Sequence, residues 1–156
     1  EDQINLLRKL WEKPVIDYKS AWHTVERAGL NPLPEKKIPI WLGGFKEVAL
    51  KRAAAIGDGF IFGSGQKENL LGWDSLKKYL NDANRDGSDF GVEALLNFQS
   101  GPKRWREDIE AWINVGASHV SMRGMALRGQ GEGLKTPHEH IKILETYWNE
   151  VGDLAD

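Results

Sequence analysis

Residues 38–42 form a short apolar run, Ile-Pro-Ile-Trp-Leu, that ends at Gly43 and Gly44 and leads into an amphipathic segment over residues 46–55. This pattern predicts a strand, a tight turn and a helix. Glycine lets the backbone approach a ligand closely because it has no Cβ. The first N–H groups of a helix lack intrahelical partners, and the helix dipole adds partial positive charge there. The run therefore predicts an anion site, most often one for a phosphate of a cofactor or substrate.

The same alternation of apolar runs and amphipathic segments continues along the chain. It predicts strands over residues 38–42, 59–62, 92–98 and 119–122, and helices over residues 47–56, 74–86, 102–115 and 137–151. Gly57, Gly87 and Gly116 stand where glycines commonly end helices. The strands are apolar on both faces, which is typical of a buried parallel sheet. The fold class is therefore α/β, with about four β-α units. Half of a (β/α)8 barrel has this size, whereas doubly wound sheets usually have five or six strands.

The first 37 residues follow a different pattern. Ile4, Leu7, Leu10 and Trp11 recur at helical spacing, and Pro14 ends that helix. Residues 15–18 and 22–25 read as a short hairpin, and residues 31–34 as an irregular stretch. We therefore predict one domain over residues 1–156, in which residues 1–37 form a helix and a hairpin insertion and residues 38–156 form the β-α units.

Composition excludes several classes of protein. A net charge of −2 in 156 residues gives no electrostatic reason to expect nucleic-acid binding. The absence of cysteine excludes disulfides, thiolate catalysis and cysteine-based zinc sites, and it fits a cytoplasmic location. No apolar run approaches the roughly 20 residues that cross a bilayer, and no signal-like segment opens the chain, so we expect no membrane partner and no targeting segment.

Polar residues after the predicted strands are the candidates for ligand binding. Ser64, Asn97 and Arg123 each lie at or just after the carboxyl end of a predicted strand, where ligands bind in folds of this class. Arg123 can grip a phosphate or carboxylate with two hydrogen bonds, or it can form a salt bridge with a neighbouring carboxylate. After the glycines, Phe45 would offer its backbone N–H group. Lys46 would offer its ammonium group or stand solvated at the helix start.

The remaining motifs carry less chemistry. His138 and His140, two residues apart on a helix, point to different faces, so we predict no metal site. We expect His119 to be a hydrogen-bonded residue of the core or rim, and the role of His23 is left open. The glycine-rich segment 129–136 fails as a phosphate-binding P-loop because Leu134 stands where glycine should precede the lysine. A glycine-rich loop over the site is the alternative. No side chain is assigned as catalytic.

Taken together, several segments resemble the luciferase-like monooxygenase family over nearly the whole chain and in the same order. The segments that carry the resemblance are residues 10–18, 22–25, 31–34, 38–45, 49–54, 57–60, 104–106, 116–119 and 134–141. The resemblance implies a partial TIM barrel that corresponds to its second half, roughly strands five to eight. It also implies an oxidoreductase that uses FMN or the deazaflavin coenzyme and acts on a small-molecule substrate.

The resemblance also implies what completes the fold. The family's first four β-α units are missing from these residues, and in relatives much of the flavin-ring pocket lies there. The expected partners are therefore a missing N-terminal half-barrel or a second subunit, and family members are commonly homo-oligomers. In this setting Gly43, Gly44, Phe45 and Lys46 would hold the coenzyme's phosphate end, and the other cofactor-binding residues, Ser64, Asn97 and Arg123, would line the mouth. Two alternatives are a catalytically silent half-barrel that serves as an association module, and an open flavodoxin-like sheet.

Overall fold

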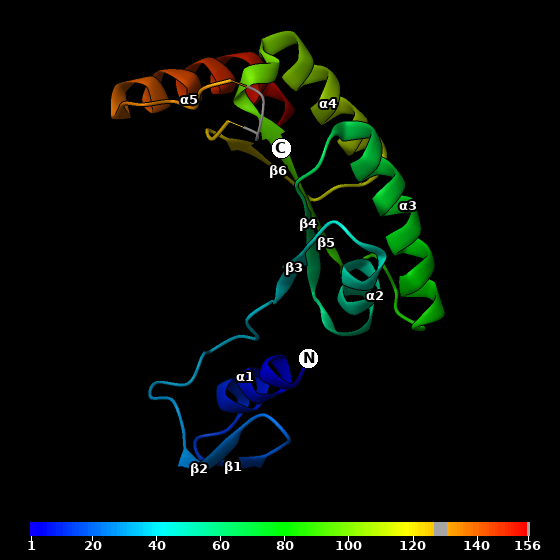
Figure 1. Ribbon diagram of the computed structural model, residues 1–156, viewed down its shortest axis with the longest axis vertical. Coiled ribbons are helices and arrows are strands. Elements are labelled where there is room, and N and C mark those ends of the chain that lie inside the picture. Colours follow the sequence, from blue (N-terminus) through cyan, green and yellow to red (C-terminus); the bar gives the residue numbers. More distant parts are fainter. Residues whose placement is uncertain (127–130, 156) are drawn as a thin grey trace. The chain divides into compact units, whose positions relative to one another are not determined.

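The computed structural model describes residues 1–126 and 131–155. The chain divides into two compact units, Glu1–Ile40 and Trp41–Asp156. Figure 1 shows the elements of both units in the colours of the sequence. Over the part of the chain that is described, no helix has the length and apolar character needed to span a membrane.

Helix α1 (Asp2–Glu12) and a two-stranded antiparallel hairpin build the first unit. The hairpin joins β1 (Ile16–Lys19) to β2 (Thr24–Ala28), which confirms the hairpin predicted from the sequence. Helix α1 ends before Pro14 because a residue that precedes proline is driven into extended backbone. Lys13 accordingly has φ −127° and ψ 138°.

The Asp2 carboxylate ties the start of α1 to this hairpin. It accepts hydrogen bonds from the Tyr18 hydroxyl and from the Ser20 hydroxyl at 2.8 Å, and it lies 2.7 Å from His23 Nδ1. The hydrogen bond from Tyr18, followed by the one from His23, lowers the pKa of Asp2 from 3.8 to about 2. His23, left open by the sequence, thus belongs to a network that holds the first unit together.

The lowered pKa of Asp2 predicts that acid destabilises the first unit. The folded carboxyl binds its proton less tightly than the unfolded one, so its contribution to stability is complete above about pH 4 and is lost as the pH falls towards 2. The protection factors for amide hydrogen exchange in β1 and β2, which correct for the intrinsic pH dependence of exchange, should therefore fall over that interval. The variant Asp2→Asn should exchange faster at neutral pH and respond less to acid. Equal acid profiles for the two proteins would contradict the prediction.

The second unit is built on a four-stranded parallel sheet in the order β3-β4-β5-β6. Its strands are β3 (Trp41–Gly43), β4 (Gly59–Phe62), β5 (Gly91–Asn97) and β6 (His119–Arg123). The predicted α/β class with a parallel sheet is confirmed. Because the strands neighbour one another in chain order, strand order does not reverse within the described residues. The flavodoxin-like alternative, which needs such a reversal, is therefore wrong.

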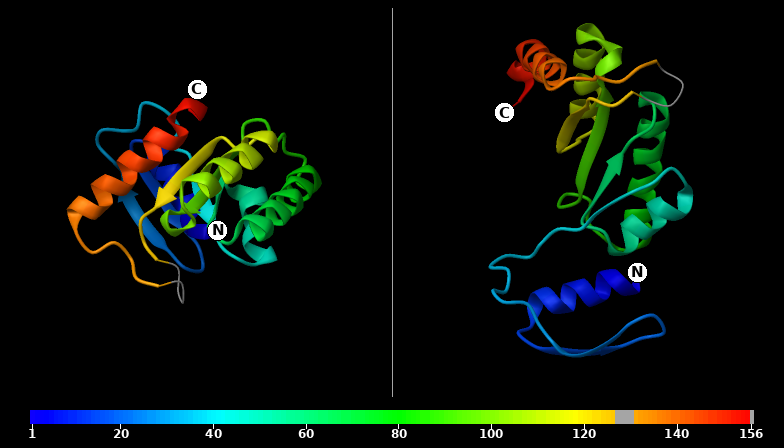
Figure 2. Two further views of the ribbon diagram at one scale, coloured as in Figure 1. Left: turned by 90° about the horizontal axis from the view of Figure 1, so that it is seen from above. Right: turned by 60° about the vertical axis from the view of Figure 1, so that its left-hand side comes forward.

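Four helices follow the strands, and three of them cover one side of the sheet. They are α2 (Glu47–Ile56), α3 (Gln66–Asp82), α4 (Pro102–Asn114) and α5 (Pro137–Val151). Short 3-10 turns follow β5 at Phe98–Ser100 and α5 at Gly152–Leu154. In Figures 1 and 2, α2, α3 and α4 lie on the same side of the strands. Helix α5 begins with a capping box between Thr136 and Glu139 and packs on α4.

The core lies between the sheet and these helices. Side chains alternate along a strand, so Phe60 and Phe62 of β4 and Val92 and Ala94 of β5 face the helices and are buried. They pack with four residues of α3 and α4, namely Trp73, Leu76, Leu80 and Trp112. A second cluster joins β5, α4 and α5 through Leu96, Trp105, Ile109 and Val151.

On the opposite face of the sheet, Trp41 covers two glycines. A Cβ built on Gly59 would lie 2.5 Å from the indole, and one built on Gly91 would lie 2.0 Å from it. His119 meets the same indole edge-on, with ring centroids 5.0 Å apart, and its Nδ1 lies 3.0 Å from the Ser118 hydroxyl. His119 is therefore a packed rim residue, as the sequence predicted.

Two predicted boundaries are wrong. The strand expected over residues 38–42 begins only at Trp41 and ends at Gly43. The helix expected over residues 74–86 runs instead from Gln66 to Asp82. Gly72 weakens the local helix signal, but a Cβ there would come within 3.0 Å of Phe62. Close packing of α3 on β4 therefore outweighs the low propensity.

The terminal glycines were predicted with mixed success. Gly57 follows α2, and Gly116 follows α4 with φ +82°, as predicted. Gly87 does not end α3, because the helix stops at Asp82 and Asn84 supplies the left-handed residue with φ +52°. Asparagine tolerates this conformation better than most residues, so it can replace glycine at a helix end.

Arg85 caps the carboxyl end of α2. Its Nη1 donates to the carbonyl oxygens of Ala54 at 2.8 Å and Gly57 at 2.7 Å, and the guanidinium lies over the Phe90 ring. Replacing Arg85 by methionine keeps aliphatic contact and removes these bonds. We expect the free energy of unfolding to fall by about 1–3 kcal/mol in urea denaturation. Arg52→Met, on the exposed side of α2, should cost far less. Equal losses in the two variants would contradict the assignment.

Candidate functional site

A pocket of about 190 Å³ lies at the carboxyl ends of β4, β5 and β6. It is lined by Ser64, Gly65, Gln66, Asn69, Leu95, Leu96, Asn97, Ser100, Arg104, Asp108 and Arg123. Three of the residues predicted from the sequence, Ser64, Asn97 and Arg123, therefore meet in one pocket. The other predicted residues, Gly43, Gly44, Phe45 and Lys46, lie at the end of β3 and in the turn that follows it, at the same edge of the sheet, and do not line this pocket.

The two glycines of that turn have different constraints. Gly44 has φ +149°, and a Cβ built on it would lie 2.6 Å from the Ala49 Cβ. The turn therefore requires glycine at this position. Gly43 is exposed, and a Cβ there would meet only the Ile61 carbonyl oxygen at an ordinary 3.5 Å. Packing within the protein does not require Gly43 to lack a side chain.

The amino end of α2, which follows the turn, lacks a side-chain cap. Lys46 occupies the N-cap position and makes no capping hydrogen bond, and the Phe45 side chain is 74% exposed. The nearest acid, Glu47, is held by Lys51 Nζ at 2.7 Å and by the Tyr79 hydroxyl at 2.8 Å. Both hydrogen bonds lower the pKa of Glu47, and the one from Lys51 has the larger effect. The amino end of the helix is thus open to an outside anion.

Asn69 fixes the loop that carries Ser64. Its side chain is buried at 4% exposure; its Oδ1 accepts from the Ser64 N–H at 3.0 Å and its Nδ2 donates to the Ser64 carbonyl at 2.9 Å. This residue was not predicted from the sequence. Asn69 precedes the helix that was predicted to begin at residue 74, so its place on the buried face of α3 left no signal in the sequence.

Two charged residues of α4 also reach the pocket and were missed. Arg104 Nε lies 2.9 Å from the Asp108 carboxylate, whose side chain is only 13% exposed. Burial raises the pKa of Asp108, while the Arg104 charge opposes that rise. The i, i+4 spacing of the pair signals a surface ion pair, and only the fold shows that it lies against the strand ends.

Arg123 and Asn97 are neighbours in the sheet, at the last paired position of β5 and β6. The Asn97 carbonyl accepts from Trp105 Nε1 at 2.9 Å, which anchors the end of β5 to α4. Arg123 Nε is buried and has no hydrogen-bond partner among residues 1–126 and 131–155. Within those residues no carboxylate pairs with Arg123, so the salt-bridge alternative is wrong there.

The other motifs contribute little to this site. The part of the chain that is described contains no cluster of three or more metal-binding side chains. Of the glycine-rich segment 129–136, residues 129 and 130 lie outside the described residues.

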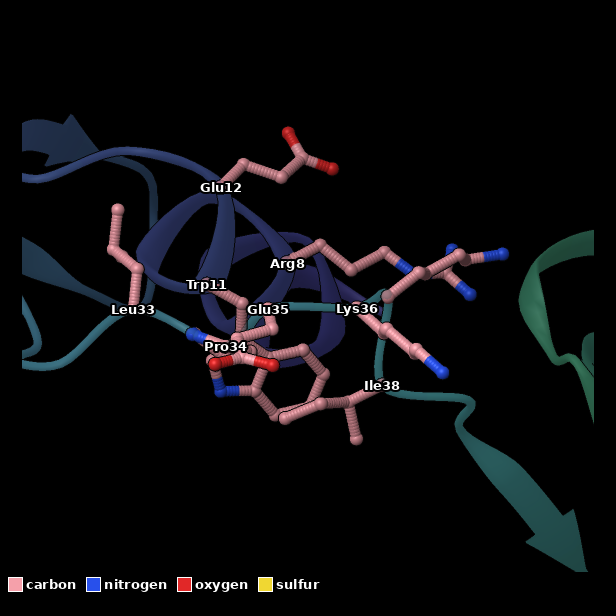
Figure 3. A pocket seen from close by; sticks show the side chains of 9 residues that line it. Arg8, Trp11, Glu12, Leu33, Pro34, Glu35, Lys36 and Ile38 are labelled. Carbon is pink, nitrogen blue, oxygen red and sulfur yellow. The ribbon is translucent and has the colours of Figure 1, made fainter.

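A second pocket, of about 370 Å³, lies within the first unit. It is lined by Arg8, Trp11, Glu12, Leu33, Pro34, Glu35, Lys36, Lys37 and Ile38. In Figure 3 the Trp11 indole lies beside Ile38, and the charged ends of Arg8 and Lys36 point to the same side. None of the residues predicted to bind a ligand lines it.

Comparison with known proteins identifies relatives of known activity. The F420-dependent glucose-6-phosphate dehydrogenase of Mycobacterium avium is 25% identical over 116 residues, which cover 71% of this chain and 34% of that enzyme. The enzyme of the same name from Mycolicibacterium smegmatis is 27% identical, with the same coverage. The chain thus spans about a third of the length of these relatives.

Solved structures show the same fold at lower identity. An F420-dependent secondary alcohol dehydrogenase in complex with an F420–acetone adduct superposes with a TM-score of 0.71 at 14% identity, over 98% of this chain and 60% of the other. The coenzyme F420-dependent tetrahydromethanopterin reductase from Methanopyrus kandleri superposes with a TM-score of 0.59 at 12% identity, over 73% of this chain and 53% of the other. The model of the luciferase-like monooxygenase family matches residues 1–153. The chain belongs to the luciferase-like monooxygenase family.

Proposed function

We propose that this chain is the coenzyme-binding second half of a TIM barrel in an F420-dependent oxidoreductase. The observation that carries the proposal is that Gly43 is exposed although packing does not require a glycine there. It stands beside a turn that requires Gly44 and beside the amino end of α2, which has no side-chain cap. The relatives and solved structures named above are F420-dependent, so the deazaflavin coenzyme is favoured over FMN. When bound, this coenzyme supplies the hydride-carrying ring.

The residues after β3 fit the phosphate end of such a coenzyme. Backbone N–H groups beside Gly43 and at the start of α2 would donate to phosphate oxygens, and the exposed Lys46 ammonium would add positive charge. Phe45 reaches towards the loop after β4, since its ring lies 3.8 Å from where a Gly63 Cβ would stand. Ser64, Asn97 and Arg123 would line the mouth, where they orient ligands and exclude water.

The sheet itself supports a barrel that further β-α units complete. β3 and β6 each pair on one side only in the described sheet, and parallel sheets are normally covered on both faces. The face opposite the helices presents Ile61, Leu95 and Trp41, which are only half-buried. A missing N-terminal half-barrel, or a second subunit in a homo-oligomer, would cover this face and the unpaired edges.

The test is a coenzyme titration of the protein expressed from its complete reading frame. Deazaflavin fluorescence should saturate with F420, and a parallel titration with FMN should show weaker binding. The folded protein has room for the methyl group of Gly43→Ala, so this variant should fold normally. It should weaken F420 binding about tenfold only if a phosphate closely approaches that backbone. Gly87→Ala, at an exposed glycine with equal room, is the matched control. Absence of binding by both coenzymes, or full affinity in Gly43→Ala, would overturn the proposal.

A catalytically silent association module is the second candidate. A groove of about 660 Å³ runs along α4 and α5, and its lining includes Ile109, Ile113, Tyr147 and Trp148. Trp148 is 62% exposed, which is unusual for so large an apolar side chain. Sedimentation measurements would show self-association that Trp148→Ser weakens. Self-association without coenzyme binding would favour this candidate over the oxidoreductase.

A further inference from the structure

The pocket at the ends of β4, β5 and β6 carries one uncompensated positive charge. Its charged lining residues are Arg104, Asp108 and Arg123. Arg104 is neutralised by Asp108 at 2.9 Å, whereas Glu107, which lies 3.6 Å from Arg104, does not line the pocket. Arg123 has no such partner among residues 1–126 and 131–155, so it supplies the net charge of the pocket.

The Arg123 guanidinium also has an unused donor in a buried position. Its Nε is inaccessible to water and has no hydrogen-bond acceptor within the described part of the chain. A guanidinium cannot release its proton to avoid this situation, and it has no acceptor atoms of its own. The group therefore favours a ligand that brings acceptor oxygens and negative charge.

The amide side chains around Arg123 are already engaged and so are not its missing acceptors. Gln66 accepts from Trp112 Nε1 at 2.8 Å and donates to the Asp108 carbonyl at 3.2 Å. Asn69 uses both ends of its amide on the Ser64 backbone. The Ser64 and Ser100 hydroxyls line the same pocket, and each can donate to a ligand oxygen.

We propose that this pocket binds an anionic group, a carboxylate or a phosphate, of the enzyme's organic substrate, with Arg123 as the residue that selects it. The inference rests on the proposed oxidoreductase function and names its substrate class. The turn after β3 does not line this pocket. The coenzyme's phosphate end and the substrate's anionic group would therefore occupy different places along the same edge of the sheet.

The test follows the Arg123 Nε–H resonance by NMR during titration with methyl phosphate and, separately, with acetate. We expect a saturable shift of this resonance and of the Asn97 amide with at least one of the two anions, and the stronger of them identifies the substrate's group. Arg123→Gln should weaken anion binding at least about tenfold. The anion affinity of Arg123→Lys should lie between those of the parent and of Arg123→Gln. Arg52→Gln removes the same charge from an exposed site and should bind as the parent does. Dispersed amide spectra of each variant establish that it folds.

A gain of affinity provides a test that misfolding cannot imitate. Asp108→Asn removes the carboxylate that lines the pocket beside Arg104, so anion affinity should rise several-fold. Shifts confined to the amides of residues 45–47, or equal affinity in Arg123→Gln and the parent, would overturn the inference.

The coenzyme titration separates this inference from the function on which it rests. Arg123→Gln should lose the anion and keep F420 affinity, whereas Gly43→Ala should show the reverse. Loss of F420 affinity in Arg123→Gln with unchanged anion binding would assign Arg123 to the coenzyme and overturn the inference alone. Anion binding without any coenzyme binding would overturn the oxidoreductase function and leave only an anion pocket.

Discussion

Replacing Trp112 by alanine is expected to lower the free energy of unfolding of the second unit by about 3–5 kcal/mol. Trp112 is fully buried, its ring lies 5.5 Å from that of Phe62, and its Nε1 donates to Gln66 Oε1 at 2.8 Å. The substitution removes an indole from the cluster that joins α4 to β4. It also leaves Gln66 Oε1 without the donor that it has in the parent.

Urea denaturation followed by circular dichroism measures this effect. Trp148→Ala is the matched control, because it removes the same side chain from a position that is 62% exposed. The control should cost no more than about 1 kcal/mol. Similar losses in the two variants would show that Trp112 does not anchor the core as described.

Replacing Gly44 by alanine is expected to displace the turn after β3 and to weaken F420 binding by more than about tenfold. The new Cβ would lie 2.6 Å from the Ala49 Cβ, and a backbone with φ +149° costs a non-glycine residue about 1–3 kcal/mol. The strain moves the peptide groups that would meet the phosphate. Stability and coenzyme affinity should therefore fall together.

A second substitution separates the contact from the backbone strain. Ala49→Gly removes the clashing methyl group but leaves φ unchanged, so the double variant should recover only part of the lost stability. Thermal unfolding and fluorescence titration of the parent, both single variants and the double variant provide the comparison. Parental affinity in Gly44→Ala would contradict the proposed role of the turn.

The order of the elements could be predicted from the sequence, whereas some of their ends could not. Apolar runs marked all four parallel strands, and proline and glycine marked most helix ends. The start of α3 was missed because Gly72 is unfavourable in an isolated helix, and only its contact with Phe62 shows why it is tolerated. Such tertiary contacts outweigh local propensity and leave no periodic signal.

The candidate site was predicted where strand ends determine it. Ser64, Asn97 and Arg123 lie at or just after the carboxyl ends of strands in one parallel sheet, so their convergence follows from topology. Asn69 and Asp108 were missed because they lie on helices, and the rotation of a helix against the sheet depends on packing that spacing does not reveal.

The Trp41 indole occupies the space that side chains at Gly59 and Gly91 would need. These three positions can therefore vary only in concert: a larger residue at either glycine demands a smaller one at position 41. Among homologous sequences, a bulky aromatic residue at position 41 should occur together with glycine at positions 59 and 91. Where position 41 carries a small residue, larger residues should be tolerated at those two positions.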